Sequence, residues 1–354
     1  MDKRIAYIHG RPSGHPIHDA YAKSLSADFM PVDFLLNWQA NERQNKFKRF
    51  LSWILCGLFF PNRKKYDVFF CEGVREPLLF MKWFNLIRPP KKLIALMANE
   101  TLYFLSVKRY GILAEFIMKS FLKKCDVLIC IGKYQAELAN NLFPNIKIYT
   151  VFNGIPRTRM TLLQNINPEL EANKILVIAN CASISRMHYK GLDLAVETFN
   201  FLLSVVNEIE LHIVGECSEE VIKHCEKLMD KKYLNRIFFH GHDSIENHLS
   251  KSCLLLQLGR GDSFPTSTIE SAAAGVPVFV SEETGTKEVL EKIDSFFITN
   301  LHPKDISKKI QEYLKIPLTQ KNILSVKFKQ VVSDYTEDNA NVFFCNVFSK
   351  ITAN

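Results

Sequence analysis

Short runs of apolar residues recur along the chain, and the segments between them carry apolar residues at every third or fourth position. Runs that are rich in β-branched and aromatic residues, and are bounded by Gly, Pro or charge, indicate strands buried on both faces of a parallel sheet. In the first half of the chain, such runs lie at 5–9, 31–36, 67–71, 93–97, 127–131 and 146–152. The first half is therefore predicted to be an α/β domain.

The pattern restarts after the turn Asn153-Gly154-Ile155-Pro156. The apolar runs of the second half lie at 175–179, 210–214, 237–239, 254–258, 276–280 and 296–298. The helix expected between the first two runs has one apolar face, formed by Leu192, Ala195, Phe199, Leu202, Leu203 and Val206. From 303 onward the pattern is helical, without a further strong strand. The second half is predicted to be another α/β domain.

These patterns divide the chain into an N-terminal Rossmann-like domain at 1–155, a C-terminal Rossmann-like domain at 156–330 and a C-terminal helix at 331–354. That helix can pack back on the N-terminal domain. Doubly wound sheets bind ligands outside the carboxyl ends of their strands. Two such domains that face a central cleft would have the ligand site between them.

Composition and charge narrow the class of protein. The 354 residues are 47% hydrophobic and 23% charged, as in an ordinary globular chain. The formal net charge of +8 favours anionic partners. Nucleic acid is the rival partner that this charge suggests, but the basic residues are dispersed and no nucleic-acid-binding signature is present, so none is expected. The nine cysteines lack paired CxxC spacing, which favours a reducing compartment over a disulfide framework.

No targeting or membrane-spanning segment is expected. The uncharged run at 5–9 is too short for the apolar core of a signal peptide. The longest apolar stretch, 50–61, has 12 residues, whereas crossing a bilayer takes about 20. We therefore predict a cytoplasmic protein.

The segment 259–277 carries the most chemical information. It follows a predicted strand and contains a Gly-rich loop, a Pro, a short Ala-rich helix and a Gly stop before the next strand. Asp262 or Ser263 is expected to cap the helix. The amide groups at the helix start form a site for phosphate or diphosphate. Glu270 lies one turn beyond Thr266 on the same face, where a carboxylate can accept two hydrogen bonds from a ribose diol. A nucleotide would satisfy both features, whereas an isolated Asp and Glu would be only a cap and a solvated helix residue.

This segment resembles the retaining glycosyltransferases of family 4. Their hallmark is Glu-x7-Glu followed by a small-residue helix, Gly-x-Pro and a strand, and Asp262 and Glu270 stand at that offset. Further similar stretches follow the family order between about 150 and 290: Asn153-Gly154-Ile155, Lys190-Gly191, Leu211-His212-Ile213-Val214-Gly215, Arg236 to Gly241 and Gly285-Thr286-Lys287-Glu288-Val289. The resemblance implies the GT-B fold and retaining transfer of a hexose-type sugar from a nucleotide-diphosphate donor to a saccharide or lipid-linked saccharide, as in bacterial surface polysaccharide or lipopolysaccharide synthesis.

The resemblance assigns roles to individual residues. Lys190 would contact the donor diphosphate, with the backbone of Ser263, Phe264, Pro265 and Thr266 at the helix start as the place where the phosphates lie. Glu270 would hold the ribose, and Asp262 would hold hydroxyls of the transferred sugar. The family arginine is displaced, because position 184 is Ile and the nearest candidate is Arg186. Without protein context, Lys190 and Arg186 would be ordinary surface charges.

The likeness thins in the first half. The loop from Gly10 to Gly14, before a helix with His18, is similar to the family's first Gly-rich loop, and it is otherwise an ordinary strand-to-helix turn. The family's sugar-contacting His after the fourth strand is missing, and Asn99 and Glu100 lie in its vicinity. We name His18, Asn99 and Glu100 as candidate acceptor or sugar contacts.

No metal cofactor is predicted. The chain offers no Asp-x-Asp motif, and the resemblance implies that protein cations replace Mg²⁺. A zinc cluster drawn from Cys217, His224, Cys225, His240, His242 and His248 matches no compact ligand spacing. The departure at Asp262 and the missing His leave a second hypothesis, a relative that binds nucleotide-sugar without transferring it.

Two stretches indicate peripheral contact with an anionic membrane. Residues 50–60 are apolar and aromatic, and basic residues flank them at 46–49 and 63–65. Residues 108–124 place aromatic and aliphatic side chains among five basic residues. Such segments suit the interface of an anionic leaflet. The alternative is that both are helices packed on the N-terminal sheet.

Overall fold

The structure is a computed structural model that describes residues 3–9, 16–31, 46–206 and 208–353. It divides into two compact units, one formed by 1–152 with 339–354 and the other by 153–338. The chain thus passes between the units twice, near 152 and near 338. The predicted division lay at 155, and the predicted last helix began at 331.

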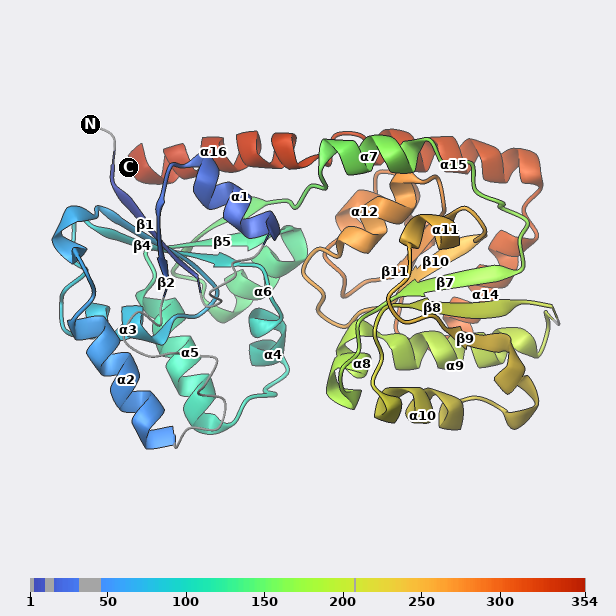
Figure 1. The fold of residues 1–354 in the computed structure, drawn as a ribbon, viewed down its shortest axis with the longest axis horizontal. Coiled ribbons are helices and arrows are strands. Elements are labelled where there is room, and N and C mark those ends of the chain that lie inside the picture. The colour runs from blue at the N-terminus through green and yellow to red at the C-terminus, as the bar shows by residue number, and fades with distance from the viewer. Residues whose placement is uncertain (1–2, 10–15, 32–45, 207, 354) are drawn as a thin grey trace. The chain divides into compact units, whose positions relative to one another are not determined.

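Unit 1 contains a six-stranded sheet, with all pairings between neighbours parallel, in the order β2-β1-β3-β4-β5-β6 (Figure 1). Its strands are β1 Ile5–His9, β2 Asp28–Pro31, β3 Val68–Glu72, β4 Lys92–Met97, β5 Val127–Ile131 and β6 Lys147–Val151. Its helices are α1 Pro16–Ser24, α2 Lys46–Leu58, α3 Glu76–Trp83, α4 Thr101–Ser106, α5 Ile112–Lys124, α6 Lys133–Leu142 and the terminal α16 Glu337–Ala353. Strands β3, β4 and β5 are almost wholly buried, as continuous apolar runs predict.

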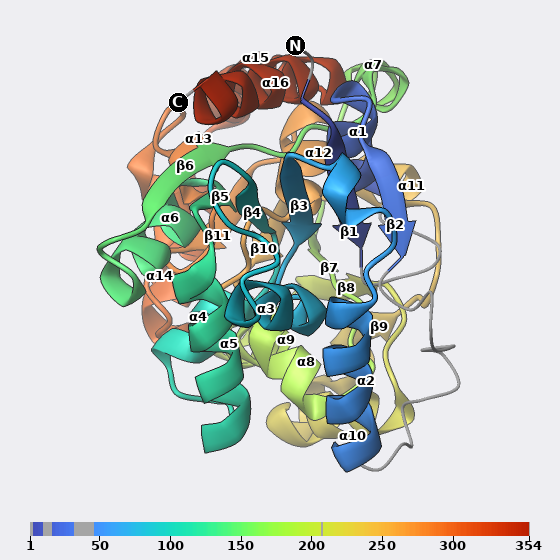
Figure 2. The ribbon, with the colours of Figure 1, turned by 90° about the vertical axis from the view of Figure 1, so that its left-hand side faces the viewer.

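The terminal helix α16 returns to unit 1 and closes one face of its core (Figure 2). Phe344 is fully buried and stacks on Tyr21 of α1 with ring centroids 4.3 Å apart. Its ring also packs against Phe70 of β3. The last apolar residues of the chain therefore belong to the core of the first domain.

Unit 2 contains a second six-stranded parallel sheet in the order β12-β11-β10-β7-β8-β9. Its strands are β7 Lys174–Ile178, β8 Glu210–Val214, β9 Ile237–Phe239, β10 Leu254–Gln257, β11 Val278–Ser281 and β12 Ile298–Thr299. Its helices are α7 Arg157–Gln164, α8 Ile184–Lys190, α9 Leu192–Leu203, α10 Glu219–Leu228, α11 Ile245–Leu249, α12 Thr266–Ala273, α13 Lys287–Leu290, α14 Pro303–Leu314 and α15 Leu318–Val332. Both units are therefore doubly wound α/β domains, as predicted.

One predicted strand was partly misplaced, and another lies largely outside the described residues. Strand β2 pairs with β1 over residues 28–31, whereas residues 32–36 of the run predicted at 31–36 are not described. The run at 296–298 was also taken as a strand, yet Phe296 and Phe297 lie in a 3₁₀ turn. Their rings pack edge-on against Phe279, and only the following residues pair with β11.

Helices α2 and α5 each bury one side and expose the other. Cys56 on α2 and Phe121 and Leu122 on α5 are buried, as expected for helices packed on a sheet. The opposite sides expose Phe50, Leu51, Leu55, Ile112, Leu113 and Phe116. Helix α3 packs against both. In the described part of the chain, no helix combines the length and the apolar character that a bilayer crossing requires.

Candidate functional site

The candidate donor residues lie where the strand order of the unit 2 sheet reverses. Strands β7 and β10 are neighbours in the sheet. The chain after β7 leads to β8 on one side of this pair, and the chain after β10 leads to β11 on the other side. Ligands of open α/β sheets bind outside the carboxyl ends of the strands at such a switch point. Arg186 and Lys190 lie on α8, which follows β7, and Asp262 lies in the loop that follows β10. The fold therefore brings two segments about 70 residues apart in sequence to one edge.

The carboxyl end of α8 is fixed against the loop after β10. Gly191 ends α8 in the left-handed region, with φ of 71°, and a Cβ on it would lie 1.8 Å from the carbonyl oxygen of Leu258. The Arg260 amide donates to the carbonyl of Tyr189, and the Arg260 guanidinium donates to Asp193. Because these contacts fix the backbone on both sides of Lys190, they set the position of its side chain.

Gly191→Ala is expected to destabilise unit 2. A non-glycine residue in this backbone region costs about 1–3 kcal/mol, and the clash with Leu258 adds to that. Urea unfolding would measure the loss. Gly111→Ala is the matched control, because nothing lies within 4 Å of its Cβ position and its φ is −66°. Equal stability of both variants would contradict the proposed role of Gly191.

Lys190 and Asp262 form an ion pair, with 2.7 Å between Nζ and Oδ2. The Lys190 side chain is 21% exposed and that of Asp262 is 9% exposed, so the ammonium remains accessible from solvent while the carboxylate faces inward. Two of the three residues expected to be catalytic, Lys190 and Asp262 but not Arg186, are thus joined in one ion pair. A diphosphate that approached Lys190 would compete with Asp262 for its protons.

Neither Asp262 nor Ser263 caps α12, contrary to the prediction. The helix begins at Thr266 with Pro265 at the N-cap position and no side-chain cap. The Asp262 carboxylate is held by Lys190 instead, and its backbone carbonyl accepts from the amide of Gly285. Gly285 packs directly on this loop, and a Cβ on it would lie 1.5 Å from the carbonyl oxygen of Ser263.

The loop ahead of α12 is packed inside unit 2. Ser263, Phe264 and Pro265 are buried, and the Phe264 ring stacks on Tyr335 with centroids 6.1 Å apart. Thr266 is partly exposed. The first amide groups of a helix have no acceptor within it. The partly exposed Thr266 side chain can therefore contact a ligand, whereas the buried side chains of the three residues before it hold the loop in place.

Arg186 lies one helical turn before Lys190 on α8. Its guanidinium lies 5.1 Å from the centroid of the Tyr189 ring, and the Lys190 ammonium lies 5.6 Å from the same centroid. The backbone amide of Arg186 donates to Ser183, which caps the helix. Two cations thus flank one aromatic ring at the end of β7, an arrangement that suits a multiply charged anion.

Glu270 is held by a cation that sequence analysis did not name. Arg159 of α7 donates from Nε to Oε1 of Glu270 at 2.8 Å, and Nη1 of the same guanidinium group is paired with Glu246 of α11. The Glu270 side chain is 15% exposed. The three residues join α7, α11 and α12. No local motif marks Arg159, because its partners lie 87 and 111 residues away in sequence.

The candidate residues of unit 1 lie at the switch point of its own sheet, between β1 and β3. His18 is 4% exposed, and its Nδ1 lies 2.6 Å from Oε1 of Glu72, the last residue of β3. The side chain of Asn99 accepts from the amide of Thr101 and approaches Gly73. Glu100 occupies the N-cap position of α4 without a side-chain cap bond. Glu72 is therefore a site residue that sequence analysis missed.

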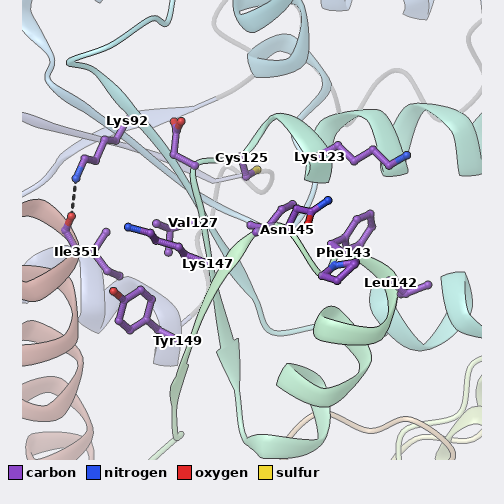
Figure 3. Close-up of a pocket in the computed structure, with 13 residues that line it drawn as sticks. Lys92, Lys123, Cys125, Val127, Leu142, Phe143, Asn145, Lys147, Tyr149 and Ile351 are labelled. Atoms are coloured by element: carbon purple, nitrogen blue, oxygen red, sulfur yellow. Dashed lines mark hydrogen bonds between the residues drawn. The ribbon is translucent and has the colours of Figure 1, made fainter. Parts of the chain in front are cut away.

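The predicted donor contacts Gly10 and Gly14 lie outside the described residues. A pocket found in unit 1 lies elsewhere, at the amino ends of β4, β5 and β6 (Figure 3). Lys92, Lys123 and Lys147 line it, and Lys92 donates to the carbonyl of Ile351 on α16 at 2.6 Å. The pocket lies at the amino ends of the strands, whereas His18 and Glu72 lie at their carboxyl ends, so it contains none of the candidate residues.

The match to a known protein family lies within unit 2. Residues 166–329 match the model of the family described as glycosyl transferases group 1, a range that includes Arg186, Lys190, Asp262 and Glu270. The O-antigen biosynthesis glycosyltransferase WclY of Escherichia coli is 24% identical over 232 residues, which are 62% of this chain and 62% of that protein. The match thus covers less than two thirds of the relative's own length.

Solved structures of similar fold cover nearly the whole chain. Sucrose-phosphate synthase from Thermosynechococcus elongatus matches with a TM-score of 0.71 and 13% identity, covering 99% of both chains. The Anabaena protein Alr3699/HepE, in complex with UDP-glucose, matches with a TM-score of 0.69 and 12% identity over 98% of this chain and 100% of that one. A glycosyltransferase from Rickettsia africae matches with a TM-score of 0.68 and 16% identity over 100% of both. These likenesses confirm the GT-B fold class, and residues 166–329 are the part of the chain that matches the glycosyl transferases group 1.

Proposed function

We propose that the protein is a retaining glycosyltransferase of family 4 that moves a hexose-type sugar from a nucleotide-diphosphate donor to a saccharide or lipid-linked saccharide in bacterial surface polysaccharide synthesis. The observation that carries the proposal is the Lys190–Asp262 ion pair at the switch point of unit 2, inside the range that matches the glycosyl transferases group 1. The O-antigen name of the Escherichia coli relative supports the class of acceptor.

Lys190 neutralises the departing diphosphate in this proposal. Sugar transfer develops negative charge on the leaving phosphate, and positioned cations and amides stabilise that charge. The partly exposed Lys190 ammonium, the neighbouring Arg186 guanidinium and the first amides of α12 all lie near the ends of β7 and β10. Protein cations thereby perform the role that Mg²⁺ has in metal-dependent transfer, and we propose that no metal takes part in the transfer step.

The two carboxylates of the motif bind the remainder of the donor. Asp262 accepts from hydroxyls of the transferred sugar once Lys190 turns to the phosphates. Glu270 accepts from the ribose diol and keeps Arg159 as its countercharge. We assign no carboxylate nucleophile; the leaving phosphate removes the proton of the acceptor hydroxyl, which then attacks from the same face. The product keeps the anomeric configuration of the donor.

Unit 1 binds the acceptor in this proposal. The His18–Glu72 pair lies at the carboxyl end of β1 and β3, where this sheet order places a ligand. Asn99 at the end of β4 adds an amide to the same edge. These polar groups suit a saccharide.

A ligand panel and a product analysis test the proposal together. Purified protein is screened by thermal shift against UDP, GDP, ADP, CMP and their sugars, beginning with UDP-glucose, because a bound ligand raises apparent stability by mass action. One nucleoside diphosphate and its sugars are expected to stabilise the protein strongly. The anomeric configuration of the product is then read by NMR. The absence of any nucleotide effect would overturn the donor site, and an inverted product would overturn the retaining mechanism.

We also propose that unit 1 binds peripherally to anionic lipids at the inner face of the cytoplasmic membrane. Ile112, Leu113 and Phe116 project from α5 with exposed fractions of 92%, 71% and 59%, and Lys123 and Lys124 end the same helix, exposed to solvent. Exposed apolar side chains beside basic residues favour the interface of an anionic leaflet. This contact would place the acceptor domain next to a lipid-linked saccharide.

Replacing Ile112 and Leu113 by Asp is expected to abolish binding to anionic vesicles. Co-sedimentation with phosphatidylglycerol vesicles measures the bound fraction, and phosphatidylcholine vesicles test the dependence on charge. The control is Ile323→Asp, because Ile323 is 69% exposed on α15 in unit 2. Binding that survives the double substitution, or that falls equally in the control, would refute the proposed membrane face.

A nucleotide-sugar-binding relative without transferase activity is the second candidate. It is favoured by one observation: both motif carboxylates, Asp262 and Glu270, already have cationic partners in the structure. Such a protein would bind a nucleoside diphosphate in the panel but neither hydrolyse nor transfer its sugar. Turnover with any acceptor therefore separates the two candidates.

A further inference from the structure

Three histidines of unit 2 come together away from the candidate donor residues. His212 lies on β8, His240 directly follows β9, and His248 lies on α11. One ring nitrogen of each lies within 4.8 Å of those of the other two. The zinc set considered from sequence contained His240 and His248 but not His212, because nothing in the spacing of the chain marks a residue in the middle of a strand. The sheet register brings it there.

Two carboxylates orient these imidazoles. Oε2 of Glu210 lies 3.1 Å from Nε2 of His212, and Oδ2 of Asp243 lies 2.8 Å from Nε2 of His248. A carboxylate accepts, so each of these Nε2 atoms carries the proton and each Nδ1 keeps its lone pair. A carboxylate behind the outer nitrogen of an imidazole is the usual arrangement at metal centres, where it fixes the tautomer and raises the basicity of the ligand.

Nδ1 of His212 accepts a hydrogen bond from Nε2 of His240, and the ring of His248 lies beside that of His240. Nδ1 of His212 lies 2.8 Å from Nε2 of His240, and those two rings are stacked nearly parallel. The rings of His240 and His248 have centroids 4.4 Å apart.

A cation already stands at this cluster. The ammonium of Lys174, at the start of β7, lies 2.8 Å from Nδ1 of His248, and burial lowers its pKa. Since an ammonium only donates, it marks Nδ1 of His248 as an acceptor directed into the cluster. Lys174 would therefore have to withdraw for a metal ion to enter the cluster.

We propose that His212, His240 and His248 form a binding site for one divalent transition-metal ion of the zinc type. Three imidazoles suit Zn²⁺, Ni²⁺ and Cu²⁺ rather than Mg²⁺ or Ca²⁺, and water completes a tetrahedral shell around zinc. Binding displaces the Lys174 ammonium, and the proton on Nε2 of His240 moves to Nδ1 of the same ring, so that the imidazole stays neutral. The ion would tie α11 to the sheet edge at β8 and β9. It takes no part in sugar transfer, so this inference stands apart from the proposed function.

The test measures metal binding to protein without a purification tag. After treatment with a chelator, ZnCl₂ is titrated calorimetrically, and Co²⁺ is titrated with visible spectroscopy as a probe of tetrahedral coordination. Wild type is expected to bind one equivalent. His212→Ala and His248→Ala are expected to lose the site, whereas His242→Ala, an exposed neighbour, keeps it. Zinc binding that is absent in wild type, or that persists in both variants because the cysteines hold the ion, overturns the proposal.

Two further variants keep the test decisive if the histidine variants fail to fold. Asp243→Asn is expected to weaken zinc binding by about 10- to 100-fold, as other losses of a carboxylate behind a ligand do. Lys174→Met removes the competing cation, and zinc binding is then expected to tighten by about tenfold. A hydrogen-bonded cluster without a metal role predicts no effect of zinc in any variant, so unchanged affinity in both would also overturn the site.

Discussion

Lys190→Ala is expected to lower the rate of sugar transfer at saturating donor by about 100- to 1,000-fold, the range found when one stabilising group is removed from a developing negative charge. The Lys190 side chain is 21% exposed at the switch point of the unit 2 sheet, and the contacts of Gly191 and Arg260 fix the backbone that carries it. A steady-state assay with the donor identified in the panel measures the rate. The donor KM is expected to change less than the rate, because the charge at the diphosphate grows toward the transition state.

The ion pair with Asp262 supplies a control for structural damage. Removal of Lys190 leaves the 9% exposed carboxylate of Asp262 without its cation, and an unpaired charge of that kind is costly. Asp262→Asn in the same chain is expected to restore the melting temperature but not the transfer rate. Lys223→Ala, which breaks an exposed pair with Glu219, should leave both unchanged. Recovery of transfer in the double variant would show that Lys190 only neutralises Asp262.

Much of the fold could be predicted because it depends on local pattern. A parallel sheet buried on both faces requires continuous apolar runs, and β1, β5, β8 and β9 were predicted with their observed bounds. The errors lie where tertiary contacts decide. The run at 296–298 is apolar, yet packing of its phenylalanines on Phe279 favours a 3₁₀ turn over an extended strand.

The candidate site was predictable only where it is local in sequence. The offset between Asp262 and Glu270, and their position after a predicted strand, mark the segment by residue order alone. The pairing of these carboxylates with Lys190 and Arg159 could not be predicted from residue order, because Lys190 is 72 residues from Asp262 and Arg159 is 111 residues from Glu270. The pairing depends on the strand order, which places the connections after β7 and β10 at one edge. A helix cap at Asp262 was the expected local solution, and the distant lysine displaced it.

The assignment of Glu270 predicts a loss of nucleotide affinity that depends on the ribose. A carboxylate that accepts from a diol makes two charged hydrogen bonds of about 1.5–3 kcal/mol each, so Glu270→Ala is expected to weaken binding of the preferred nucleoside diphosphate by at least about 100-fold. The ion pair with Arg159 uses Oε1 of Glu270. A purely structural Glu270 would join α12 to α7 through Arg159, and its loss would then lower stability without changing the preference for ribose.

A double comparison separates these two roles. Calorimetry measures the affinity of wild type and Glu270→Ala for the ribonucleotide and for its 2′-deoxy and 3′-deoxy analogues. Wild type is expected to bind the deoxy analogues at least about tenfold more weakly, since the carboxylate is then left with an unused acceptor. Glu270→Ala is expected to bind all three alike. Glu246→Ala is the control, because it removes the other carboxylate of the Arg159 cluster and leaves Glu270 in place. If the preference for ribose survives in Glu270→Ala but is lost in Glu246→Ala, the ribose contact belongs to another residue of that cluster.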